Sequence, residues 1–213
     1  MRRLALAVVA ATLAACASGP PAPEWQATAS GALSGFQAAW LAGRTKVAEQ
    51  EFARARDALA ATGKPGLVAR AELVRCAART ASLDFDDCPG YRALAADAAP
   101  PERAYAAYLE GRAQAADIAL LPEHHRAAAS ANLGAIADPL SRLVAAGVLF
   151  RRAAIAPEGI AVAVETASAQ GWRRPLLAWL GVQHNRAEAA GDRQAAEAIR
   201  RRIQLVAGED RPK

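Results

Sequence analysis

Alanine dominates this chain and limits what it can fold into. Of the 213 residues 53% are apolar, and 60 are alanine, so more than half of the apolar residues carry only a methyl group. Alanine is the best helix former, whereas the β-branched residues that favour strands are few, with 11 Val, 6 Ile and 6 Thr. Charged residues make up 22% and are interspersed, which is untypical of a disordered chain. The composition therefore predicts an all-α fold and argues against all-β and parallel α/β folds.

Glycine and proline divide the chain after residue 23 into segments with a helical pattern. Apolar residues recur every three or four positions between Trp25 and Trp40, and Gly43 ends this segment. Pro157 and Pro175 stand where later helices are expected to begin, because proline fits the first turn of a helix. The pattern predicts roughly nine or ten helices, mostly of about 14–18 residues, joined by short turns. They form one helical domain over residues 24–208, followed by a polar tail at 209–213.

Part of this pattern resembles the tetratricopeptide repeat. Ala48, Phe52 and Ala55 have the spacing of the Ala, Phe and Ala in the second helix of that repeat, and they follow Trp40 and Gly43. The resemblance covers about a third of the chain, and a period of about 34 residues does not recur. It implies stacked helical hairpins, as in a solenoid. The alternative is an irregular helical bundle.

The first fifteen residues have the features of a secretion signal. Arg2 and Arg3 precede an uncharged apolar run that ends at Ala15, and this run is shorter than the about 20 residues of a membrane-spanning helix. The sequence Leu13-Ala14-Ala15-Cys16 resembles the lipobox of bacterial lipoproteins. In that family the cysteine becomes the mature N-terminus and its sulfur carries the lipid. The alternative is an ordinary secretory signal cleaved near Ala15, with Cys16 incidental.

The lipoprotein resemblance also implies a location. Ala17 follows Cys16, where an Asp favours retention in the inner membrane of enteric bacteria, so we expect the periplasmic face of the outer membrane. Residues 16–23 hold the lipidated cysteine and a linker rich in proline and glycine, which favours an extended spacer over a helix. The expected protein is held at the membrane by its acyl chains, with its helical body outside the membrane.

The two remaining cysteines are expected to form a disulfide. With Cys16 assigned to the lipid, Cys76 and Cys88 make an even pair twelve positions apart, and the periplasm is oxidising. A redox pair or a metal site is the alternative, but the C-x-x-C spacing is missing. The loop between them contains Asp84, Asp86 and Asp87, which we interpret as turn and cap residues because the calcium-loop pattern is absent.

The sequence contains none of the motifs that we would expect of a metal site or an enzyme. His124 and His125 are adjacent, and neighbouring residues of a helix point about 100° apart, so the pair needs a further ligand to hold a metal. We interpret Glu123, His124 and His125 as polar residues of a first helical turn after Pro122. No phosphate loop, G-x-G-x-x-G or G-x-S-x-G motif occurs. We therefore expect no metal, no cofactor and no catalytic residues.

Basic residues gather in the last third of the chain. Without Arg2 and Arg3 the chain has 24 basic and 21 acidic residues, and from Pro139 onward it has 12 basic and 7 acidic ones. A periplasmic location argues against a nucleic-acid partner. Arginine groups and two nearby tryptophans form a candidate interaction surface; the alternatives are solvated helix faces and buried tryptophans. The residues concerned are Arg151, Arg152, Trp172, Arg173, Arg174, Trp179, Arg200, Arg201 and Arg202.

Together these observations predict an outer-membrane-anchored periplasmic lipoprotein whose helical body binds or scaffolds another envelope protein. Known helical-repeat lipoproteins of this kind act in β-barrel assembly, secretin piloting and envelope coordination. The alternatives are an envelope enzyme or cell-wall hydrolase accessory with an unrecognised active site, and a ligand-binding or purely structural lipoprotein. A groove lined by exposed aromatic and arginine side chains favours the interaction protein, and a deep pocket with a buried carboxylate favours the enzyme.

Overall fold

The computed structural model describes residues 23–126 and 132–208. Within these ranges the chain forms helices and no strands, which confirms the prediction of an all-α fold. The expected signal peptide, Cys16, nearly all of the linker and the polar tail lie outside the described residues.

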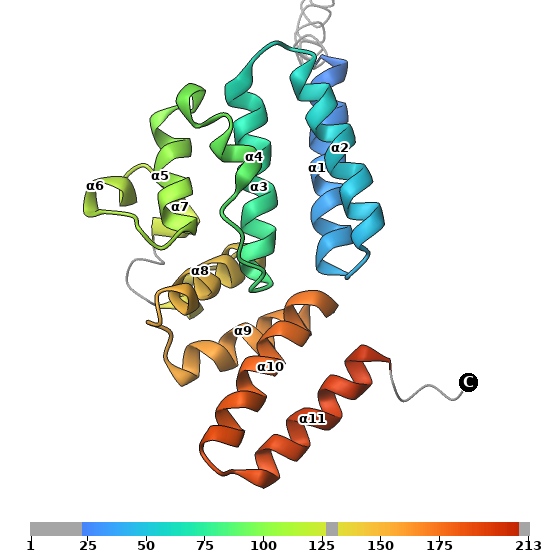
Figure 1. Ribbon diagram of the computed structural model, residues 1–213, viewed down its shortest axis with the longest axis vertical. Coiled ribbons are helices and arrows are strands. Elements are labelled where there is room, and N and C mark those ends of the chain that lie inside the picture. Colours follow the sequence, from blue (N-terminus) through green and yellow to red (C-terminus); the bar gives the residue numbers. More distant parts are fainter. Residues whose placement is uncertain (1–22, 127–131, 209–213) are drawn as a thin grey trace, which may run out of the picture.

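Eight helices of ten or more residues form most of the fold (Figure 1). They are α1 Glu24–Leu41, α2 Thr45–Ala60, α3 Pro65–Ala81, α5 Pro100–Leu109, α8 Pro139–Arg151, α9 Pro157–Ala169, α10 Arg173–Ala189 and α11 Arg193–Ala207. Single turns connect them between α3 and α8: α4 Pro89–Arg92, α6 Ala115–Ile118, α7 Glu123–Arg126, and the 3-10 turns η1 Ala95–Asp97 and η3 Leu133–Ala135.

The middle of the chain departs from the predicted regular helices. Between Ser82 and Asp138 only α5 exceeds one turn among the described residues, whereas the sequence pattern predicts helices of about 14–18 residues; α7 ends where the described range ends, at Arg126. Short helices are marginal in water and depend on packing of an apolar face. Pro89, Pro100 and Pro101 divide the first part of this segment into short stretches, and Gly111, which has a positive φ, follows the end of α5.

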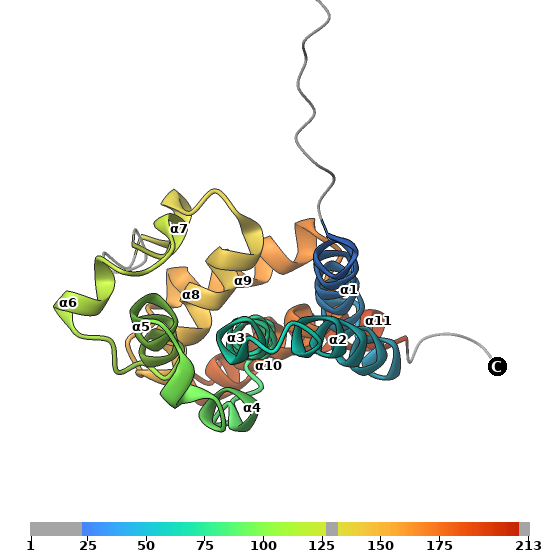
Figure 2. The ribbon, with the colours of Figure 1, turned by 90° about the horizontal axis from the view of Figure 1, so that it is seen from above.

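Most pairs of successive long helices pack against each other in hairpin-like contacts, and two further contacts join distant parts of the chain. Helices α1, α2 and α3 lie side by side, and α5 lies against α3 on the side away from α2 (Figures 1 and 2). Helices α8, α9, α10 and α11 each pack on the next. In addition, α8 packs on α3 and α1 packs on α10, so the C-terminal half is attached directly to the N-terminal half.

Small side chains allow these helices to approach closely. Ala32, Ala48, Ala55, Ala78 and Ala146 are fully buried, as expected where helix backbones approach closely. The larger core residues form two clusters, one around Phe36 and Phe52 in the first hairpin and the other around Leu143, Ile160 and Trp179. Leu94, Leu140 and Trp172 touch both clusters and connect them.

Arg174 fastens the start of α10 to the first hairpin. Its Nε donates to the carbonyl oxygen of Trp40 at 2.8 Å, and its guanidinium carbon lies 3.9 Å from the centre of the Trp40 ring. A second nitrogen donates to Oγ1 of Thr45 at 2.6 Å. The Trp40 indole in turn donates to the carbonyl oxygen of Ala78, so α1, α3 and α10 meet at this one ring.

Candidate functional site

A large cavity among the described residues lies between α3, α5, α7 and the start of α8. Its volume is about 740 Å³, a size typical of small-molecule sites and of pockets that receive a few side chains of a partner. Leu73, Val74, Leu140 and Val144 contribute apolar walls. Its polar lining comes from a small set of side chains described next, and together they make this cavity the candidate functional site.

A buried carboxylate, Glu102, belongs to the cavity wall. Glu102 is 8% exposed, and its Oε1 accepts from Nε of Arg70 at 2.8 Å and from Nη2 of the same arginine at 2.5 Å. Its other oxygen, Oε2, is closed to solvent and has no hydrogen-bond partner among the described residues. The cavity therefore has one carboxylate oxygen held by an arginine and one with unused acceptor capacity.

A tyrosine–histidine pair forms a second polar part of the wall. The hydroxyl of Tyr105 lies 3.2 Å from Nε2 of His125, and the two ring centres are 5.2 Å apart. The centre of the Tyr108 ring is also 5.2 Å from that of the His125 ring. His125 is 4% exposed, and within the described part of the chain its Nδ1 has no hydrogen-bond partner.

Burial keeps this pair uncharged at neutral pH. It lowers the pKa of His125 to about 4, and the neighbouring His124 acts in the same direction, whereas Asp138 acts weakly against them. Burial also raises the pKa of Tyr105 above its usual value, and the nearby Tyr108 and Asp138 add to this rise. The pair therefore offers neutral hydrogen-bonding groups.

Two more charged residues lie at the edge of the cavity. Asp138 caps the start of α8, where its Oδ2 accepts from the backbone N–H of Ser141 at 2.7 Å. Arg126 at the end of α7 donates from Nε to the carbonyl oxygen of Leu121 at 2.9 Å. With Arg70 and Glu102, the lining thus has two basic and two acidic side chains around apolar walls. Such a lining suits binding of a group with an apolar body and a polar head.

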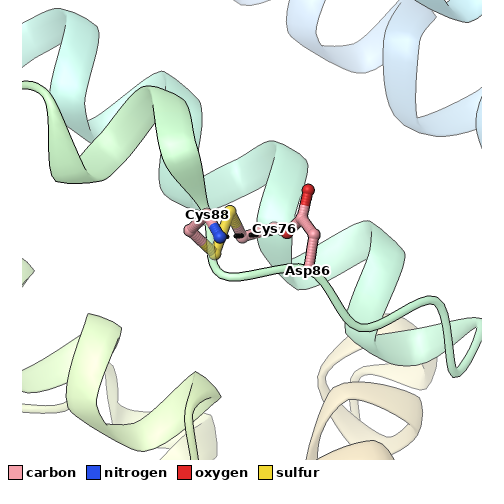
Figure 3. Close-up of side chains that lie close together, drawn as sticks. All are labelled: Cys76, Asp86 and Cys88. Atoms are coloured by element: carbon pink, nitrogen blue, oxygen red, sulfur yellow. Dashed lines mark hydrogen bonds between the residues drawn. A yellow bond between two sulfur atoms is a disulfide. The ribbon is translucent and has the colours of Figure 1, made fainter.

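The predicted cysteine pair forms a disulfide away from this cavity. Figure 3 shows Cys76 of α3 bonded to Cys88, which precedes α4. Asp86 accepts from the backbone N–H of Cys88 at 3.1 Å, as expected for a turn residue. The sulfurs and the Asp86 carboxylate are close together, but sulfurs in a disulfide are not thiolate ligands for a metal.

The residues of the predicted interaction surface make separate structural contacts. Trp179 is fully buried and donates to the carbonyl oxygen of Ala81, so its assignment to a surface is wrong. Arg173 donates to the carbonyl oxygens of Val206 and Ala207 at the end of α11, and Trp172 is half-buried between the two core clusters.

The remaining arginines of that set lie at the ends or outer faces of helices. Arg151 lies over the ring of Phe85, and Arg152 lines a second cavity of about 200 Å³ beside Tyr108. Arg200 pairs with Glu197 at 2.8 Å, and Arg201 and Arg202 are exposed on the same helix, α11. The contacts described for the nine residues of the predicted surface join them to other helices or to neighbouring side chains. None of the nine lines the larger cavity.

Most residues that line the larger cavity are not evident from sequence reasoning. It singles out only His124 and His125, as polar residues of a first helical turn. Both do lie in that turn, α7, but sequence reasoning does not predict that the His125 ring is buried. A usable signal is present in α5: Glu102 shares a helical face with Tyr105 and Leu109, three and seven positions later. An acidic residue on an apolar face indicates a buried carboxylate.

Comparisons of the chain with protein-family models, with curated proteins and with solved structures found no significant match. None of the described helices has the length and the apolar character that crossing a membrane requires.

Proposed function

We propose that this protein is a lipoprotein anchored to the periplasmic face of the outer membrane, whose helical body binds another protein of the cell envelope through the cavity between α3, α5, α7 and α8. The cavity carries the proposal, because an apolar pocket with a polar rim is where a partner's anchor residues bind and bury. The lipobox around Cys16 supports the location, and a tether of this kind raises the local concentration of the body near membrane partners.

Two exposed aliphatic residues allow a matched test in cells. Leu120 is 43% exposed and lines the cavity, whereas Val47 is 40% exposed and lies on α2 outside it. A photoactivatable phenylalanine analogue at position 120 should give a discrete crosslinked product with an envelope protein, and the same analogue at position 47 should not. Filling the cavity with Val74→Trp should remove the product. Equal products at both positions, or none at 120, would contradict the proposal.

The buried Glu102 favours a second candidate, an envelope enzyme. General acid–base catalysis needs a group placed to give or take a proton. Here the Glu102 carboxylate is bound by Arg70, and the Tyr105–His125 pair is neutral, so binding explains the geometry more directly. Lysis of purified cell wall by the wild type but not by Glu102→Gln would favour the enzyme over the binding protein.

A further inference from the structure

We propose that the cavity receives a lysine side chain set among apolar residues of the partner protein, with Oε2 of Glu102 as the acceptor for its ammonium group. This inference rests on the proposed function, because it specifies what the partner presents to the cavity. Glu102 is only 8% exposed, and a carboxylate oxygen in such a place without a hydrogen-bond partner among the described residues is costly. A ligand that donates to it would remove that cost.

The arrangement of Arg70 selects the kind of donor. Both bonding nitrogens of its planar guanidinium converge on Oε1, so a single oxygen is left on the carboxylate. A second guanidinium binds best to both oxygens at once, whereas an ammonium group is a compact donor that fits one oxygen. The remaining acceptor therefore favours lysine over arginine.

The apolar lining of the cavity matches the lysine stem and the apolar partner residues on either side of it. Leu73, Val74, Leu140 and Val144 offer apolar contact for the methylene stem of a lysine and for its aliphatic neighbours. Asp138, on the same lining, adds a second carboxylate, which offsets the positive charge of Arg126 there. The Arg70 side chain is 68% exposed, so a small shift that opens Oε2 to the cavity can keep its bonds to Oε1.

Short blocked peptides test this directly on the full-length protein. The probes are N-acetylated, C-amidated Leu-Leu-Lys-Leu-Leu and its analogues with arginine or norleucine at the centre, and binding is measured by titration calorimetry. The lysine peptide should bind at least about tenfold more tightly than either analogue. Glu102→Gln should reduce it to the level of the norleucine peptide, whereas Arg70→Met should strengthen lysine binding, because the competing cation is gone.

Glu49 provides the matched control. It pairs with Arg75 at 3.1 Å, as Glu102 does with Arg70, but neither residue lines the cavity, so Glu49→Gln should leave peptide binding unchanged. The inference is overturned if the norleucine or arginine peptide binds as tightly as the lysine peptide, or if none binds. In that case crosslinking at Leu120 still decides the proposed function. Lysine-selective binding without a crosslink at Leu120 would instead contradict the proposed function and leave the lysine site itself supported.

Discussion

The buried ring of His125 makes stability depend on pH. Its pKa is about 4 in the folded protein and close to 6.5 in the unfolded chain. Between these values the unfolded chain binds more protons, so the free energy of unfolding falls as the pH is lowered from about 6.5 to about 4. The full loss is about 3 kcal/mol. Urea unfolding of the wild type and of His125→Phe between pH 7.5 and 4.5 should show a shallower loss in the variant.

The neighbouring His124 supplies the control for this experiment. It is exposed, so His124→Gln should retain most of the pH dependence of the wild type. Carboxylates titrate in all three proteins, and the comparison among them isolates the His125 contribution. Identical pH profiles for the wild type and His125→Phe would contradict the prediction.

The sequence could identify the titratable residues but not their surroundings. For Glu102 the helical face was readable, because Tyr105 and Leu109 follow at helical spacing. For His125 it was not, since the rings that contact it come from α5, about twenty positions away in the sequence. Burial of such a residue is decided by what packs over it.

At the scale of helices, Gly147 sets how closely α8 crosses α3. A Cβ at this position would overlap the carbonyl oxygen of Thr80 and lie 2.9 Å from its Cγ2. Gly147→Ala should therefore force the two helices apart and reduce the free energy of unfolding by about 1–3 kcal/mol. A Cβ added at Gly181 in α10 would meet no neighbouring atom within 4 Å, so Gly181→Ala should be neutral or slightly stabilising. Thermal unfolding of the two variants measures the difference; an equal effect would exclude a tight crossing.

The helices themselves were largely predictable, and their crossings were not. Asp138 and Asp192 each accept from a backbone N–H at the helix start, and Gly43, Gly171 and Gly191 follow helix ends with positive φ. Such signals are local in sequence and can be read directly. The contact of α3 with α8 joins residues more than sixty positions apart, and the sequence alone gives no rule for which alanine-rich faces meet.

At the scale of the whole molecule, two side chains of α10 connect the C-terminal half of the chain to the N-terminal half, in addition to the packing of α8 on α3. Arg174 joins α10 to Trp40 and Thr45, and Trp179 joins it to Ala81 at the end of α3. The sequence indicated an external surface for Arg174 and Trp179, because an arginine and a tryptophan on a helix can serve an interface or a core equally well. In the structure Trp40 and Trp179 are buried where the two halves meet, and Arg174 binds Trp40, so these side chains stabilise the fold.

The expected anchor is a property of the whole molecule, since it decides where the cavity is presented. Cys16 should carry fatty acyl chains, whereas Cys76 and Cys88 are bonded to each other and should carry none. Growth with an alkyne-tagged palmitate should therefore label the wild type and the Cys88→Ala variant, and Cys16→Ala should lose the label. Two or three acyl chains bind a bilayer far more firmly than one, so the labelled protein should sediment with outer-membrane fractions. Label on Cys16→Ala would show that the lipobox interpretation is wrong and that another residue carries the acyl chains.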